Sequence, residues 1–236
     1  MALPKLNALP KYECILPSKN KSIRFRPFLV KEQKVLLIAM ESQDPKVING
    51  AVNDIISDCI DSNISLSQMT SYDIEYLFTQ IRAKSVGETI QLNLNCQDEE
   101  CGEQTLIEVN LEQVKVDEVQ ETSKTIELAD GIHIKIQHPT FGRLSQVQSA
   151  ETETETLLEL MMASIDSVMT EEENISFKEH THEEQVEFVD SLTSDQLAKM
   201  LEFLNAIPAL TYDVDWNCSS CGKENSLTLR GLADFF

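Results

Sequence analysis

Four cysteines in two matching pairs are the residues of this chain most suited to chemistry. Cys96 and Cys101 lie in "NCQDEECGEQ", and Cys218 and Cys221 lie in "NCSSCGKEN". An alternating strand pattern precedes each pair, and a glycine and a second strand pattern follow it. Because structural Zn²⁺ takes four ligands in a tetrahedron, the pattern predicts one zinc site. Its two halves lie 117 positions apart in the sequence.

The same cysteines have a redox alternative, since a single CxxC also occurs in disulfide oxidoreductases. A redox CxxC normally begins a helix, which lowers the pKa of the thiol, whereas Cys218 and Cys221 lie between two predicted strands. Four cysteine ligands also close the coordination shell, and a catalytic zinc keeps one position open. We therefore expect a structural zinc that ties the C-terminal strands to the middle of the chain.

Other candidate sites have plainer explanations. "HTHEE" at His180–Glu184 matches a helix-capping box better than a metal site, because Thr181 and Glu184 have the capping spacing. Cys59 lies on an apolar helix face and is expected in the core, and Cys14 has no evident partner. The chain has no phosphate-binding loop, dinucleotide fingerprint, nucleophile elbow or HExxH motif. The sequence thus predicts no enzyme and no small-molecule substrate.

Hydrophobic periodicity predicts an α+β fold, with helical segments flanking a small antiparallel zinc-ribbon-like module. Two distant strand–knuckle–strand units would build that module. We expect five segments in order: an extended basic arm at 1–26, a helical segment at 27–87, a β segment with the first knuckle at 88–138, an acidic helical segment at 139–208, and a β-hairpin with the second knuckle at 209–236, pairing with 88–112.

Three expectations concern the region after the first knuckle. A hairpin is expected around Asp130-Gly131, a pair that tolerates positive φ. The stretch "ETETETLLELMMASIDSVM", residues 151–169, is expected to form one helix whose start is not defined by a cap, and residues 169–180 are expected to form an acidic mobile connection. Capped helices are then expected from Thr181 and from Thr193.

The charge is strongly acidic and unevenly distributed. The net charge is −21, yet residues 1–34 sum to +6 and the remainder to −27. An acidic body repels nucleic acid and anionic membranes, so neither is an expected partner. No apolar run is long enough to span a membrane and no secretory signal is apparent, which predicts a cytosolic protein.

Two groups of residues are candidate partner-binding sites. Lys19, Lys21, Arg24 and Arg26 could dock the basic arm onto an acidic surface, either a partner's or the chain's own. The terminal Phe235 and Phe236 follow a strand and a glycine. Terminal aromatic rings either tuck into the local core or insert into a partner's pocket, and both placements stay open.

Several stretches in order resemble the T4-type bacteriophage baseplate protein family, which is associated with the baseplate hub and its assembly. They are "IRFRPFLVKEQKVLLIAMES", "IRAKSVGE", the first knuckle, "EFVDSLTSDQLAKMLEFLNAIP" with the second knuckle, and "GLADFF". The resemblance covers residues 22 to the end and includes no catalytic signature.

The resemblance implies a non-enzymatic structural or assembly protein of a contractile-tail baseplate hub. Its partners would be other tail and hub proteins, and it would be made in the host bacterial cytoplasm. It leaves open whether the protein stays in the virion tail baseplate or acts as an assembly chaperone for hub or tape-measure proteins, absent from the mature virion. A zinc-ribbon nucleic-acid-binding accessory protein is the further alternative, against which the acidic knuckle loops argue.

Overall fold

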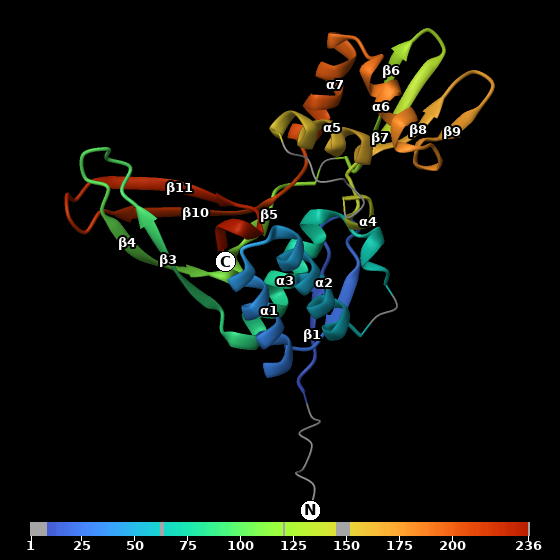
Figure 1. The fold of residues 1–236 in the computed structure, drawn as a ribbon. Helices are drawn as coiled ribbons and strands as arrows, with labels where there is room; N and C mark the ends of the chain where they lie inside the picture. Colours follow the sequence, from blue (N-terminus) through green and yellow to red (C-terminus); the bar gives the residue numbers. More distant parts are fainter. Residues whose placement is uncertain (1–8, 62–63, 120, 145–151, 236) are drawn as a thin grey trace, which may run out of the picture. The chain divides into compact units, whose positions relative to one another are not determined.

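A computed structural model describes residues 9–61, 64–119, 121–144 and 152–235. The chain divides into two compact units, which are described separately. The first unit comprises residues 1–64, 72–117 and 209–236, and the second comprises 65–71 and 118–208. Each unit is therefore assembled from segments that are distant in the sequence (Figure 1).

The first unit combines helices with three small antiparallel sheets. β10 pairs with β11 and β5, while β1 pairs with β2 and β3 with β4. Its helices and strands are β1 (Tyr12–Ile15), β2 (Ser22–Phe25), α1 (Val30–Ser42), α2 (Pro45–Cys59), α3 (Ser71–Val86), β3 (Thr89–Asn95), β4 (Gln104–Asn110), β5 (Lys115–Val116), β10 (Leu210–Asn217) and β11 (Glu224–Arg230), with short 3₁₀ turns η2 (Leu111–Gln113) and η4 (Leu232–Phe235).

Local sequence explains where α2 begins and which face it buries. Asp44 is the N-cap residue and its side chain accepts a hydrogen bond from the Lys46 N–H at 2.8 Å, with Pro45 at the first helical position. The face that carries Val52, Ile55 and its neighbours is buried. This helix follows directly from its cap and its 3.6-residue periodicity.

The expected extended arm is wrong for its described part. Residues 12–25 form the β1–β2 hairpin, in which Ile23 and Phe25 are fully buried. The Ser18 N–H donates to the Asp73 carboxylate on α3 at 3.0 Å and fixes the turn of the hairpin. Burial of alternate apolar residues thus makes this segment part of the core, which its prolines and basic residues obscure in the sequence. Residues 1–8 lie outside the described part.

The second unit packs helices on one antiparallel sheet in the order β6-β7-β8-β9. Its elements are η1 (Leu66–Gln68), β6 (Ser123–Ala129), β7 (Ile132–Gln137), α4 (Phe141–Leu144), α5 (Glu153–Ser164), β8 (Ile165–Met169), β9 (Asn174–Ser176), η3 (Phe177–Glu179), α6 (His182–Asp190) and α7 (Ser194–Asn205). Ile134 and Ile136 of the sheet share a core with Met161 of α5 and Phe203 of α7.

Local signals succeed in part of this unit and fail in another. Gly131 has φ +73° in the β6–β7 turn, so the predicted hairpin is confirmed. The helix expected over residues 151–169 forms as α5 but ends at Ser164, because Ile165 and Val168 of β8 pair with β7 and pack in the core. The expected mobile connection at 169–180 is a β8–β9 hairpin and a 3₁₀ turn with Phe177 buried.

Among the described residues, no helix has the length and apolar character needed to cross a membrane.

Candidate metal centre

The two cysteine pairs lie in the turns of two separate hairpins of the first unit. Cys96 and Cys101 lie between β3 and β4, and Cys218 and Cys221 lie between β10 and β11. The four sulfur atoms lie within 4.8 Å of one another. The structure therefore brings together all four residues that the sequence selected as ligands. Besides β11, β10 pairs with β5, so the second hairpin does not pair with residues 88–112 as expected.

The sulfur–sulfur distances fit a tetrahedral metal better than a disulfide. Cys96 Sγ lies 3.7 Å from Cys221 Sγ, and Cys101 Sγ lies 3.7 Å from Cys218 Sγ. A zinc–sulfur bond of about 2.3 Å places the sulfurs of a regular tetrahedron about 3.8 Å apart. A disulfide would need about 2.05 Å. Both measured contacts join one knuckle to the other, as a shared metal requires.

The two knuckles share two backbone features, although four residues separate Cys96 from Cys101 and only two separate Cys218 from Cys221. The first cysteine of each pair donates its N–H across the hairpin, from Cys96 to the Glu103 carbonyl at 2.8 Å and from Cys218 to the Lys223 carbonyl at 2.9 Å. The glycine after the second cysteine has positive φ, +57° at Gly102 and +74° at Gly222. An L-residue adopts this conformation at a cost. The turn geometry explains why glycine follows the second cysteine in both pairs.

Backbone N–H groups also set the acidity of the sulfurs. Hydrogen bonds from the N–H groups of Cys221 and Ser220 lower the pKa of the Cys218 thiol to about 6, with the neighbouring thiols contributing further. The Glu103 N–H acts in the same direction on Cys101, but the thiols of Cys221 and Cys218 outweigh it and raise the pKa of Cys101. The thiolate of Cys218 is thus favoured near neutral pH, and a bound cation would favour the thiolates of Cys101 and Cys221 as well.

Asn225 on β11 joins the two knuckles and was not selected from the sequence. Its side-chain carbonyl accepts from the Gln97 N–H at 2.8 Å and lies 3.7 Å from Cys96 Sγ, while its amide donates to the Lys223 carbonyl at 2.8 Å. Asn225 is also buried. The sequence did contain a clue to its burial, because Asn225, Leu227 and Leu229 are alternate residues and so lie on the same face of the predicted strand.

Further contacts tie the first knuckle to the second hairpin. The Gln97 amide donates to the Ser226 carbonyl at 2.7 Å, and Lys223 Nζ lies 3.3 Å from the Gln97 carbonyl. Lys223 also pairs with Asp98 at 3.5 Å. These side-chain hydrogen bonds and the ion pair therefore hold the two knuckles against each other around the four sulfurs. Strands β3 and β4 form a separate sheet from β10 and β11.

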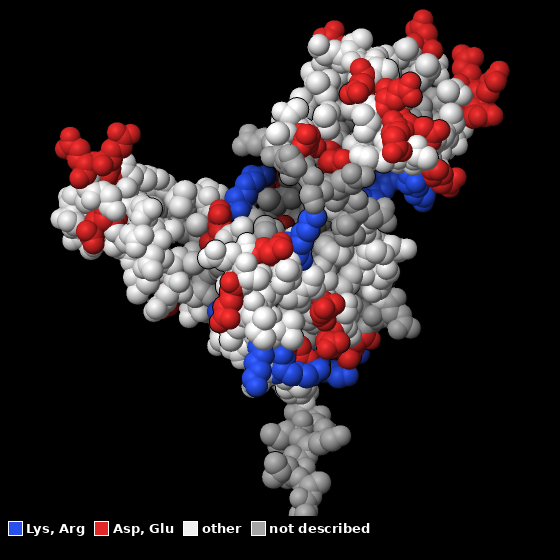
Figure 2. Space-filling model, in the orientation of Figure 1, with Lys and Arg blue, Asp and Glu red and all other residues white. Residues whose placement is uncertain are grey.

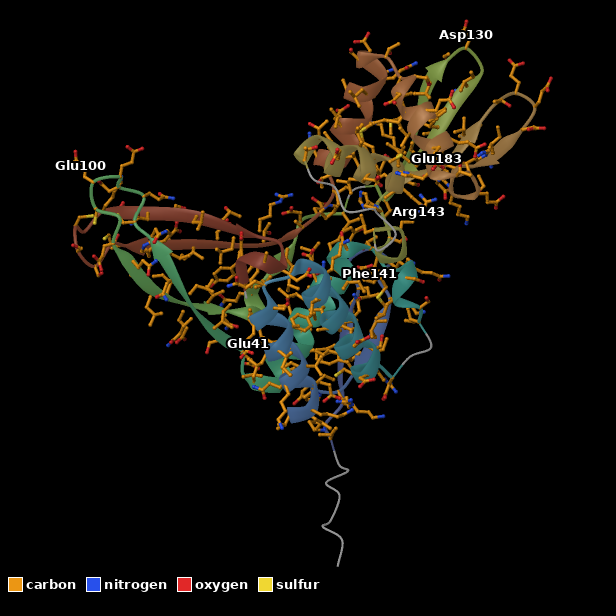
Figure 3. The ribbon with its side chains drawn as sticks, in the orientation of Figure 1. Glu41, Glu100, Asp130, Phe141, Arg143 and Glu183 are labelled. Atoms are coloured by element: carbon orange, nitrogen blue, oxygen red, sulfur yellow. The ribbon has the colours of Figure 1, made fainter. Side chains whose placement is uncertain are left out.

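The outer surface of this centre is acidic. Figure 2 shows carboxylates at the end of the β3–β4 hairpin, and Figure 3 labels Glu100 there. Asp98, Glu99, Glu100 and Glu103 all belong to this turn or its edge. Four sulfur donors match a closed structural site, and the exposed charges of the first knuckle's turn are acidic.

His180 and His182 flank Thr181, the N-cap residue of α6. The Glu184 N–H donates to the Thr181 hydroxyl at 3.3 Å and the Glu184 carboxylate accepts from the Thr181 N–H at 2.9 Å, which completes the predicted capping box. His180 lies 3.3 Å from Glu184 and His182 lies 3.2 Å from Glu159. These contacts account for the cluster without a metal.

The basic residues proposed to bind a partner do not form one exposed patch. Arg26 is partly buried and pairs with Glu32 at 2.9 Å, so it holds α1 in place. Lys19, Lys21 and Arg24 are exposed on the β1–β2 hairpin and its turn.

Phe235 belongs to a core cluster with Leu210 and Val214 and is only 1% exposed. The sequence left open whether this ring packs in the core or binds a partner, and the structure places it in the core. Phe236 lies outside the described residues.

Comparison with known proteins identifies the class to which this fold and site belong. The model of the T4 bacteriophage base plate protein family matches residues 9–236. Because the match spans nearly the whole chain, including both cysteine hairpins, the chain belongs to that family, as the resemblance implied.

One particular relative is similar along almost its entire length. The chain is 22% identical over 218 residues to the baseplate hub assembly protein gp26 of Enterobacteria phage T4, covering 92% of this chain and 93% of that protein. No solved structure matched the chain.

Proposed function

We propose that this chain is a non-enzymatic structural or assembly protein of a contractile-tail baseplate hub. The observation that supports this most strongly is the match to the base plate family over residues 9–236. The similarity to a hub assembly protein along 93% of that relative supports the hub in particular. Its partners would be other tail and hub proteins, met in the host bacterial cytoplasm during assembly.

We also propose that Cys96, Cys101, Cys218 and Cys221 hold one structural Zn²⁺ in a zinc-ribbon-like module. The four clustered sulfurs and the matching turns support this assignment. When bound, Zn²⁺ would cross-link the two hairpins through four thiolates. Asn225 and the Gln97 amides would orient the knuckles around it, and the buried face of the hairpins, with Trp216 and Val214, would form the core beneath.

The proposed function has two forms: an assembly factor released before maturation, or a component of the finished baseplate. The acidic surface is compatible with both. An infection experiment separates them. A tagged chain expressed from the phage genome would be followed by mass spectrometry in purified virions and in assembly intermediates. We expect it with hub proteins in intermediates at least. Absence from both intermediates and virions would contradict the proposed function.

The zinc-ribbon nucleic-acid alternative has a separate test. Binding to short DNA and RNA would be measured at low salt, where phosphate contacts are strongest. Because the turn of the first knuckle is acidic, we expect no binding to DNA or RNA at micromolar protein concentration. Tight binding that weakens with salt would favour the alternative.

A further inference from the structure

The outward face of α1 carries apolar side chains that the fold does not use. Val30 and Ile38 are each 66% exposed, and Leu37 is 52% exposed. Val35 and Met40 are also exposed, but the helical period places each about 110° around the helix from the centre of this face, so they lie on its flanks. Large apolar side chains scattered singly over a surface need no explanation, but several on one short helix mark an interaction surface.

The inward face of the same helix already meets the needs of the fold. Glu32 and Ala39 are buried on that side, and Glu32 binds Arg26 and the Leu29 N–H, at 2.9 and 2.7 Å. Val30, Leu37 and Ile38 lie on the other side of the helix by the 3.6-residue period. Their exposure is therefore a property of the surface and not a by-product of how α1 is anchored.

Two charges of opposite sign flank the apolar centre of this face. Lys34 precedes Leu37 and Ile38 by about one turn, and Glu41, which Figure 3 labels, follows them by about one turn. The two charges lie on the same side of the helix, about 10 Å apart along its axis. Within the described part of the chain, neither side chain makes an ion pair.

We propose that this face binds a second copy of the same chain, with the two α1 helices packed antiparallel. A twofold axis opposite Leu37 and Ile38 brings these residues against their own counterparts. Lys34 of each copy then meets Glu41 of the other. An apolar centre flanked by one positive and one negative charge is self-complementary in this way, as a twofold interface requires. This proposal depends on neither the zinc site nor the baseplate function.

The charge pattern favours a second copy over an unrelated partner. A partner segment with a single sign of charge would satisfy one end of the face and be repelled at the other. One short helix offers less area than the roughly 1,200 Å² of a standard interface. We therefore expect a weak dimer, with a dissociation constant on the order of 10 μM.

Sedimentation of the full chain over a concentration series reaching about 100 μM tests the proposal. The wild type should show a monomer–dimer equilibrium. Lys34→Glu would place two carboxylates together at each end of the interface, and Glu41→Lys would place two ammonium groups together. Each variant alone should be monomeric over the whole series.

An equimolar mixture of the two charge variants is the decisive sample. In the mixed dimer, position 34 of each chain again meets an opposite charge at position 41 of the other, so dimers should return at the wild-type concentration or lower. Because both positions are exposed, circular dichroism should show unchanged folding. Failure of the mixture to dimerise, or a wild type that stays monomeric throughout, would overturn the proposal.

A matched apolar pair provides the control. Leu37→Glu should abolish the dimer, whereas Leu106→Glu, at a residue 57% exposed on β4, should leave it intact. If Leu106→Glu alone disrupts association, the interface lies on the β hairpins and the assignment to α1 is wrong.

Discussion

Asn225 shows how much of the candidate metal centre depends on a residue that binds no metal. It is the buried group that contacts the first knuckle through Gln97 and the second through Lys223. Outer residues of this kind orient metal ligands, and their loss typically lowers metal affinity 10- to 100-fold.

Replacing Asn225 with alanine should therefore weaken zinc binding by about 10-fold without removing a ligand. Competition with a chromophoric chelator measures the affinity. Asn217→Ala is the matched control, because Asn217 is exposed on the neighbouring strand. This variant should bind zinc with the affinity of the wild type. Equal affinities for the two variants would show that Asn225 does not support the site.

Glu32 gives the first unit a specific sensitivity to acid. Burial raises the pKa of this carboxyl group, but hydrogen bonds from Arg26, Lys31 and the Leu29 N–H outweigh burial and lower the pKa to about 2. A carboxylate with a depressed pKa stabilises the fold fully above its ordinary value of 4.5. That stabilisation is lost as the pH falls from 4.5 towards 2.

Glu32→Gln should lower the unfolding free energy at pH 7 by about 2 kcal/mol, because it removes charged hydrogen bonds at a buried position. The difference from wild type should shrink as the pH falls through that window. Urea unfolding followed by the fluorescence of Trp216, the single tryptophan of the chain, reports on this unit. Asp54→Asn, at an exposed position on α2, should change little. A difference that persists unchanged to pH 2 would contradict the role of the Glu32 charge.

At the scale of elements, local signals predicted most of the parts. The caps at Thr181 and Thr193, the turn at Gly131 and the paired knuckles all appear where the sequence places them. These features depend on neighbouring residues only, so a single sequence carries the information.

Elements that depend on distant partners were not predictable in the same way. The β1–β2 hairpin is stable because Ile23 and Phe25 enter a core supplied by later helices. β8 is a strand because β7 lies beside it, although "ELMMASIDSVM" reads as a helix. Tertiary contacts override local propensity at these places. Likewise, Arg26 lies in a basic stretch of sequence that suggested a partner-binding arm. Its ion pair with Glu32 became visible only in the folded structure.

The C-terminal turn η4 illustrates an element held by tertiary contacts. The Arg230 N–H donates to Asp234 at 2.7 Å, and the Leu232 N–H donates to Glu75 of α3. Phe235 lies in the core that also contains Leu229 and Trp216. The turn η4 therefore contributes Phe235 to the core of the first unit.

Phe235→Ala should cost about 3–5 kcal/mol of unfolding free energy, because it leaves a cavity in this core. Leu227→Ala, at a more exposed position on β11, should cost far less. Trp216 fluorescence during denaturant unfolding measures both. If Phe235→Ala is as stable as wild type yet binds hub proteins poorly, the ring serves a partner and the core assignment fails.

At the scale of the whole molecule, charge is divided unevenly between the two units. The second unit has 19 acidic and five basic residues, and so carries −14 of the net −21. Figure 2 shows carboxylates spread over the visible face of this unit. Such a surface favours partners with basic surfaces.

The first unit is assembled from three separated stretches of the chain. The last of these reaches the first knuckle through the cysteine sulfurs, Asn225 and Gln97. A metal at this point would close a loop that contains residues 118–208, the larger of the two stretches of the second unit. Closing a long loop by cross-linking restricts the unfolded chain and stabilises the fold.

The central claim is that one metal ion joins the two cysteine hairpins, and native mass spectrometry of the purified chain tests it most directly. We predict one Zn²⁺ per chain, lost on treatment with a strong chelator and absent in Cys218→Ser. Cys59→Ala, at a buried cysteine outside the site, should retain the ion. A wild-type chain that carries no metal, or a Cys218→Ser chain that carries as much zinc as the wild type, would contradict the account.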